Sequence, residues 1–245
     1  IITGGLAFTV LTDLWQSKSF HSLSLHSKLM IVGTVAINVI AVITIFLLEH
    51  HNPGTLGHLS PGEKWWGAYF QAITTRTAGF MSVPIGHLHE STLLFMMMLM
   101  FIGAGSVSAG GGIKLTTFIV IILAVLTFLR RKKQTPTVFG RTIHQRVVYR
   151  ALAVTITSMT FIFLAVFALT ITENIPFIKL MFETISAFGT VGLSTGITAD
   201  LTTVGKLIIM FVMFLGLVGP LSIVLSIAGG EEEKVRYPSE DVLTG

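Results

Sequence analysis

The segments Thr77-Ala78-Gly79-Phe80 and Thr190-Val191-Gly192-Leu193 decide how this chain of 245 residues is interpreted. Each segment follows a short apolar run and precedes a long one. A single segment of this kind is typical of an ordinary turn between two helices. Because the pattern occurs twice in the same context, we interpret it as the centre of an internal repeat. We call the two stretches the first and the second TxG segment.

The composition indicates the class of protein. Hydrophobic residues make up 52% of the chain, charged residues 11%, and the mean hydropathy is +0.81. Charged residues normally make up about a quarter of a soluble domain, so the composition predicts an integral membrane protein. The formal net charge of +4 is too modest to favour nucleic-acid binding. The chain has no cysteine, which excludes disulfides, thiolate metal sites and cysteine nucleophiles.

Long and short apolar stretches alternate along the chain. Membrane-length stretches of about 20 residues are predicted at 28–48, 92–129, 147–172 and 204–228. Two shorter stretches, 65–75 and 176–188, cannot cross a hydrocarbon core of roughly 30 Å, so we predict re-entrant helices there. The order is span, short helix, TxG segment and span, and it then repeats.

The TxG segments have the chemistry of an ion filter. A dehydrated cation needs a ring of oxygens, and backbone carbonyls supply them without a full charge in the membrane. Successive carbonyls face one axis only if ordinary and left-handed dihedral angles alternate, and glycine adopts the latter without a steric penalty. The short helix before each segment directs its partial negative end at the cation. The predicted filter residues are Thr77, Ala78, Gly79, Phe80, Thr190, Val191, Gly192 and Leu193.

The stretch 92–129 is predicted to break. A continuous helix from Leu93 to Leu129 would be about 55 Å long, nearly twice the thickness of the hydrocarbon core. Five glycines lie in its middle, and each costs about 1 kcal/mol in a helix relative to alanine. A glycine-rich packing interface is the alternative. The predicted loop comprises Gly103, Ala104, Gly105, Ser106, Val107, Ser108, Ala109, Gly110, Gly111 and Gly112.

Lys114 follows this loop, and the sequence leaves three roles for it open. The ammonium group plugs a cavity, extends along its helix toward water, or pairs with loop carbonyls.

Charge predicts the topology. Seven basic residues crowd the linker between the two repeats, which therefore lies in the cytoplasm; they are Arg130, Arg131, Lys132, Lys133, Arg141, Arg146 and Arg150. Lys18, Lys28 and the tail 231–245 lie on the same side, and the acidic residues Glu49, Glu63, Glu173 and Asp200 lie outside. We expect residues 130–150, and Arg130 to Lys133 above all, to bind a cytosolic partner together with the tail 229–245. The alternative is that the linker only enforces orientation and touches lipid headgroups.

Three stretches together, 72–80, 103–114 and 185–192, resemble the Ktr/Trk/HKT potassium transporter superfamily. The resemblance implies four pore units around one pore, of which this chain supplies the third and fourth. It also implies potassium at Gly79 and Gly192, a gating loop at 103–112 with Lys114, and a location in the bacterial plasma membrane with several passes. The implied partners are the remaining two pore units of the same transporter, a second copy in a homodimer, and a cytosolic nucleotide-binding regulatory ring of the KtrA type.

We therefore predict an all-α polytopic membrane protein with tandem parallel units of helix, pore helix, filter and helix, which form half of a pseudo-fourfold pore. Residues 1–27 are expected to be the end of a preceding transmembrane helix and a cytoplasmic linker. Residues 28–140 form a pore unit with a broken second helix, 141–229 form a second pore unit, and 230–245 are a cytoplasmic tail.

The predicted function is potassium uptake through a carbonyl-lined filter. The alternative is a secondary transporter that moves another small cation or solute with broken helices, although such transporters often contain inverted repeats and these repeats are parallel. An enzyme is not expected. Residues 192–196 match the G-x-S-x-G pattern of hydrolases, but no strand precedes them.

Some residues near the predicted filter need a separate interpretation. Leu217 stands where members of the superfamily usually carry arginine, which puts a charge-based part of the gate in doubt. Arg76 lies beside the first TxG segment, and we hypothesise that Glu183 pairs with it. The histidines of the predicted outer loops lack a third metal ligand and are expected to be solvated; they are His50, His51, His87 and His89.

Overall fold

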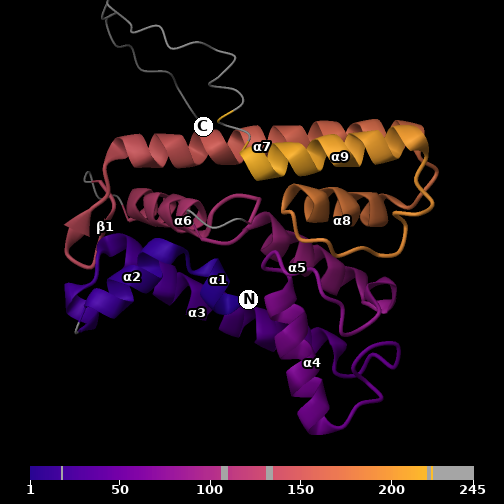
Figure 1. The fold of residues 1–245 in the computed structure, drawn as a ribbon, viewed down its shortest axis with the longest axis horizontal. Helices are drawn as coiled ribbons and strands as arrows, with labels where there is room; N and C mark the ends of the chain where they lie inside the picture. The colour runs from indigo at the N-terminus through magenta and orange to yellow at the C-terminus, as the bar shows by residue number, and fades with distance from the viewer. Residues whose placement is uncertain (18, 106–109, 131–134, 220–221, 223–245) are drawn as a thin grey trace, which may run out of the picture.

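The computed structural model describes residues 1–17, 19–105, 110–130, 135–219 and 222, and its fold is mostly helical (Figure 1). The helices are α1 (Ile2–Gly5), α2 (Phe8–Gln16), α3 (Leu25–Glu49), α4 (Pro61–Thr74), α5 (Glu90–Phe101), α6 (Leu115–Leu129), α7 (Gln145–Thr172), α8 (Phe177–Phe188) and α9 (Thr203–Val218). Single 3-10 turns lie at Phe20–Ser22 and Ile85–His87.

Local sequence signals explain where several helices begin. The Ser24 hydroxyl accepts a hydrogen bond from the Ser27 amide at the start of α3. Ser60 and Glu63 form a capping box at the start of α4, where Pro61 occupies the first turn. Proline is tolerated there because its missing N–H would have no partner inside the helix. The short helices α4 and α8 match the two predicted re-entrant stretches.

The long apolar stretch is broken between α5 and α6, as predicted. The Gly103 amide donates to the Ile113 carbonyl (2.8 Å), and the Ile113 amide donates to the Phe101 carbonyl (3.1 Å). These bonds satisfy backbone groups that the break removes from the helix, and they bring the two ends of the loop together. We call residues 102–114 the α5–α6 loop; within it, 106–109 lie outside the described residues.

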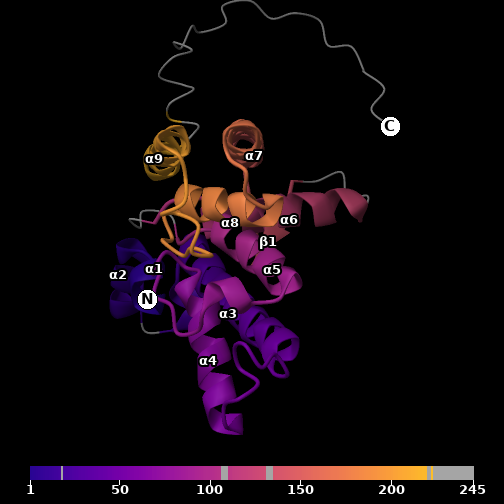
Figure 2. The same cartoon turned by 90° about the vertical axis from the view of Figure 1, so that its right-hand side faces the viewer.

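Helices α3 and α7 are long and apolar enough to cross a membrane. Most of the large side chains on α7 point outward; Phe163, for example, is 68% exposed. Helices α7 and α9 lie side by side, and they are seen nearly end-on when the molecule is turned (Figure 2). An apolar outer face such as that of α7 is expected where lipid covers the protein.

The main core lies between the two repeats. It joins side chains of α3, α4, α5 and α8, and it includes Val191 and Leu193 of the second TxG segment. We call residues 25–129 the first unit and residues 145–218 the second unit. Between them, β1 (Thr137–Val138) and β2 (Arg141–Thr142) form a small antiparallel hairpin, which is an addition to the predicted all-α fold.

Candidate ion filter and gate

The two TxG segments have the same unusual backbone. The φ angle is +57° at Thr77 and +72° at Gly79, and it is +52° at Thr190 and +90° at Gly192. The residue between each pair has an ordinary negative φ. Left-handed dihedral angles are rare and strained for β-branched threonine, so their presence at equivalent sites points to a shared constraint. This alternation is the geometry that turns successive carbonyls toward one axis.

Hydrogen bonds hold each segment against the end of its short helix. The amides of Ala78 and Gly79 donate to the Thr74 carbonyl (3.2 and 3.3 Å), and the Val191 amide donates to the Ser186 carbonyl (2.9 Å). The Thr74 hydroxyl also donates to the Phe80 carbonyl (2.7 Å). The N–H groups thus point back toward α4 and α8.

The two segments approach each other closely. A Cβ atom built on Gly79 would lie 2.2 Å from the Val191 carbonyl oxygen and 3.3 Å from the Gly192 Cα atom. Only glycine therefore fits at position 79 without moving the second segment. A Cβ atom on Gly192 would meet the Gly79 Cα atom at 3.8 Å, which is ordinary contact.

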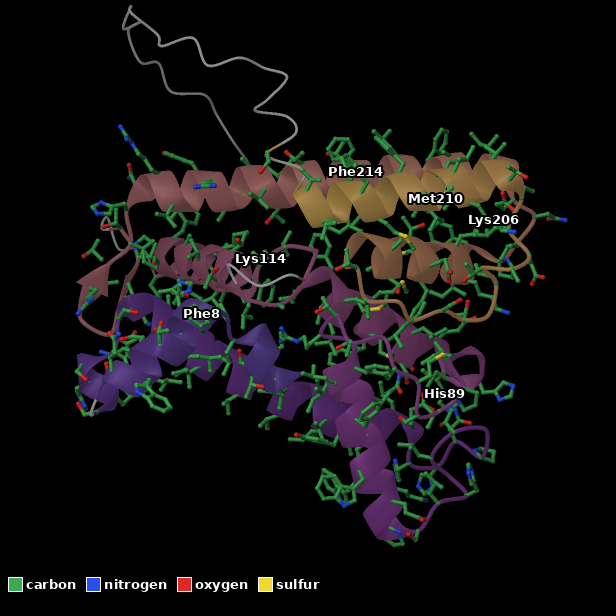
Figure 3. The ribbon with its side chains drawn as sticks, in the orientation of Figure 1. Phe8, His89, Lys114, Lys206, Met210 and Phe214 are labelled. Atoms are coloured by element: carbon green, nitrogen blue, oxygen red, sulfur yellow. The ribbon has the colours of Figure 1, made fainter. Side chains whose placement is uncertain are left out.

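The α5–α6 loop lies against the threonines of both segments. The Gly111 amide donates to the Thr190 hydroxyl (2.8 Å). A Cβ atom on Gly110 would lie 2.9 Å from the Thr77 hydroxyl oxygen, so the backbone of the loop also packs closely on the first segment. Lys114, the last residue of this loop, lies in the middle of the molecule (Figure 3). Its ammonium group donates to the Gly110 carbonyl (2.5 Å), the third of the three roles left open by the sequence.

The predicted pair of Arg76 and Glu183 is wrong for the part of the chain that the structure describes. Arg76 Nη1 donates to the Gly103 carbonyl (3.1 Å), and Glu183 Oε1 accepts from the Thr198 hydroxyl. Arg76 Nη2 and Glu183 Oε2 are both buried, and neither has a hydrogen-bond partner among the described residues. The reason is position: Arg76 borders a small cavity with Ile1 and Ile2, whereas Glu183 faces a different one beside α9.

The cavity beside Glu183 has a volume of about 510 Å³, and Leu217 also lines it. Leu217 is 64% exposed. Leu217 thus faces the same space as Glu183, whose Oε2 atom has no hydrogen-bond partner in the described part of the chain.

Several predicted residues lie outside the described residues. They are Lys18, Ser106, Val107, Ser108, Ala109, Arg131, Lys132, Lys133 and the tail 230–245. Arg130, Arg146 and Arg150 are exposed, and Arg141 belongs to β2.

The described residues do not support a hydrolase serine or a metal site. Ser194 accepts from the Gly196 amide (3.0 Å) and bonds the Thr198 hydroxyl (2.9 Å), so it stabilises a turn. Within the described ranges, no group of three or more metal-ligating side chains comes together. In the outer loops, His50 stacks on Phe46 and tilts against His51.

Glu49 and Glu173 have structural roles that were not predicted from the sequence, which indicated only that both lie outside. Glu49 is fully buried. Glu173 accepts hydrogen bonds from the amide and the hydroxyl of Thr202, and these bonds hold the pKa of the Glu173 carboxyl below its ordinary range. The sequence marks these two carboxylates only by their place: a single acidic residue directly follows the first predicted span of each repeat.

Together, two helices that are long and apolar enough to cross a membrane and the duplicated TxG segments are features of a helical membrane protein with an internal repeat. Residues 1–235 match the TrkH family, described as cation transport proteins, and the chain belongs to this family. Because this is a family of transport proteins, the prediction that the chain is not an enzyme is confirmed.

Relatives with known names support this assignment. The chain is 54% identical to the Ktr system potassium uptake protein B of Bacillus subtilis and 45% identical to the protein of the same name from Vibrio alginolyticus. Both matches cover 100% of this chain, and 55% and 54% of the relatives, so the chain spans about half the length of these curated relatives.

The fold also matches a solved structure, the potassium transporter TrkH from Vibrio parahaemolyticus. The TM-score is 0.73 at 18% sequence identity, and the match covers 91% of this chain and 50% of that one. This likeness shows the fold.

Proposed function

We propose that this chain supplies two pore units of a potassium uptake transporter, in which the TxG segments are the ion filter. The observation that carries the proposal is the alternating backbone, with left-handed dihedral angles at Thr77 and Gly79 and again at Thr190 and Gly192. Backbone carbonyls turned to one axis replace the hydration shell of a cation without adding a full charge. The relatives named as potassium uptake proteins support potassium as the ion.

The α5–α6 loop is the proposed gate. Its backbone packs on the side chains of Thr77 and Thr190, which begin the two TxG segments. A loop in this position obstructs an ion that leaves the filter. Its polar backbone is tolerated at membrane depth because it bonds to protein, at Thr190, Ile113 and Lys114.

Two further pore units complete the proposed pore. In the first unit, the end of α5 is covered by α8: Met100 is fully buried, and the Phe101 ring stacks on Phe188 with the ring centroids 6.2 Å apart. When Gly79 is aligned on Gly192, Met100 corresponds to Met213 and Phe101 to Phe214. These two side chains of α9 are 45% and 58% exposed, and Phe214 is labelled on this helix in Figure 3.

The difference in exposure between these equivalent side chains of α5 and α9 supports a further helix beside α9. Met100 is buried and Phe101 is partly buried where a second short helix packs on them, whereas Met213 and Phe214 are exposed where the described chain supplies no such helix. We propose that the short helix of another pore unit of the same transporter covers this face of α9. The exposed area would then be an interface.

The proposed regulator is a cytosolic nucleotide-binding ring of the KtrA type, because the relatives belong to Ktr systems. The exposed basic residues Arg130, Arg141, Arg146 and Arg150 provide a charged surface for it. We also propose a homodimer and a location in the bacterial plasma membrane, with lipid against the outer helices.

Rubidium flux tests the proposed function. A four-unit transporter that contains this chain is reconstituted in liposomes, and ⁸⁶Rb⁺ uptake is measured with potassium or sodium as competitor. Potassium should suppress the uptake much more strongly than sodium. Equal competition, or no uptake above that of empty liposomes, would contradict potassium conduction.

A further inference from the structure

In each unit, a carboxylate at the end of the first helix binds the start of a later helix. We call this contact a clamp; it joins α3 to α5 in the first unit and α7 to α9 in the second. In the first unit, Glu49 ends α3, and its Oε1 atom accepts from the His89 amide (3.0 Å) and the Thr92 hydroxyl (2.5 Å). His89 is the N-cap of α5, and its own side chain makes no capping bond. Glu49 therefore supplies this cap from another helix, and its charge complements the helix dipole.

The second unit repeats the arrangement. Glu173 directly follows α7, and its two oxygens accept from the amide (3.0 Å) and the hydroxyl of Thr202. Thr202 is the N-cap of α9, and its hydroxyl also accepts from the Gly205 amide (3.1 Å). A Cβ atom on Gly205 would lie only 2.3 Å from Glu173 Oε1, so the helix start and the carboxylate are packed tightly together.

The two clamps occupy equivalent positions relative to the TxG segments. His89 lies ten residues after Gly79, and Thr202 lies ten residues after Gly192. We call the connecting stretches, 81–89 and 194–202, the first and second arm. Each TxG segment is thus tied at one end to its short helix and at the other, through an arm of the same length, to a clamped residue.

A second contact strengthens the clamp on the first arm. Asn52 donates to Glu49 Oε2 (2.6 Å) and also to the His87 carbonyl (2.9 Å). The Thr55 hydroxyl donates to the same Glu49 oxygen (2.6 Å). The buried carboxylate therefore has four donors, and part of this network reaches the arm at two residues, His87 and His89. In Figure 3, His89 lies at the opposite end of α5 from the loop that carries Lys114.

We propose that Glu49 and Glu173 are positioning residues for ion selection: each carboxylate fixes the far end of an arm, so that the filter carbonyls keep the spacing that distinguishes potassium from sodium. This inference rests on the proposed function of the TxG segments. It differs from plain helix capping because it assigns the carboxylates an effect on selectivity in folded protein.

The chemistry of the donors predicts an order of effects. Asn52 Nδ2 and the His89 amide can only donate, and they contact different oxygens of Glu49. A glutamine at position 49 would face one of these donors with its own NH₂ group in either orientation. At position 173, a glutamine can direct its carbonyl to the Thr202 amide and its NH₂ group to the Thr202 hydroxyl. Glu49→Gln should therefore disturb the filter more than Glu173→Gln.

The test compares three glutamine variants of the four-unit transporter in liposomes. The matched control is Glu63→Gln, because Glu63 also caps a helix, through Ser60, but it is exposed and touches neither arm. ⁸⁶Rb⁺ uptake and its inhibition by sodium are measured per folded transporter, quantified by size-exclusion chromatography. The ratio of sodium to rubidium permeability should rise by roughly tenfold in Glu49→Gln, the effect of losing bonds to a charged group. It should rise less in Glu173→Gln and stay at the parental value in Glu63→Gln.

The outcomes separate the two proposals. If the parent takes up no rubidium, the proposed function fails. If the parent is selective and folded Glu49→Gln retains its permeability ratio and apparent KM, the carboxylate is only a helix cap and the inference is overturned. If Glu49→Gln does not fold, Thr92→Val and Thr55→Val decide. Both remove one hydroxyl from Glu49, but only Thr92 belongs to the helix that follows the first arm, so only Thr92→Val should alter selectivity. Equal selectivity in this pair also overturns the inference.

Discussion

The two glycines of the TxG segments should respond differently to alanine. Alanine at either site is forced into left-handed dihedral angles, which cost about 1–2 kcal/mol. At Gly192 this is the main cost, since the nearest atom to the new Cβ would be the Gly79 Cα at 3.8 Å. An energy of this size corresponds to a factor of about 5–30 in an equilibrium. Gly192→Ala should therefore raise the ratio of sodium to rubidium permeability by up to that factor.

Gly79→Ala should have a larger effect, because the new Cβ would lie 2.2 Å from the Val191 carbonyl oxygen. That oxygen must move by roughly 1 Å to reach a normal contact distance. One substitution thus distorts both segments. Liposome flux with sodium competition measures the effect per folded transporter.

Gly140→Ala is the matched control, because Gly140 also has a positive φ (+73°) with open space around it, but it lies in the hairpin between the units. It should pay a similar backbone cost without any change in selectivity. Parental selectivity in folded Gly79→Ala, or a larger effect in Gly192→Ala, would show that the close approach at Gly79 does not control the filter.

Substitutions at four other places in the chain should have distinct effects. Thr190→Val removes the hydroxyl that accepts the amide of the α5–α6 loop, a bond of about 1 kcal/mol, so rubidium leak without activator should rise, whereas Thr190→Ser should retain parental closure. Leu217→Arg places a cation in the cavity of Glu183, so flux should fall, and Leu217→Met should leave it unchanged. The lowered pKa of Glu173 stabilises the fold above the ordinary value of 4.5, and this stabilisation is lost as the pH falls through the folded-state pKa; thermal unfolding of Glu173→Gln should therefore depend less on acid than that of the parent. Neutralising residues 131–133 should weaken binding of a KtrA-type ring and leave selectivity intact, and parental binding across a salt series would assign the linker to topology alone.

Local signals predicted much of the fold. The lengths of the apolar stretches and the positions of the glycines predict the repeat, the two short helices and the break after Phe101. These signals are contained in residues that are close together in the sequence. The hairpin at 137–142 is formed by short strands without a strong apolar alternation, so no periodicity in this stretch predicts it.

Only those features of the site that depend on residues close together in the sequence could be predicted. The positive φ values at Gly79 and Gly192 were expected, whereas those at Thr77 and Thr190 run against the preference of threonine. The partner of Arg76 and the donors to the two clamp carboxylates come from residues distant in sequence; Glu49 and His89, for example, are 40 positions apart. Periodicity and spacing do not encode such contacts, because they depend on how the helices pack.

Locating a permeant ion would show directly whether the TxG segments form the ion filter. A four-unit transporter that contains this chain is crystallised in rubidium chloride, and anomalous diffraction is collected at the rubidium edge. We expect a peak within carbonyl-coordination distance of both TxG segments, and a weaker peak or none there in Gly79→Ala. Rubidium bound elsewhere along the pore, with no peak beside Gly79 and Gly192 in a transporter that conducts, would contradict it.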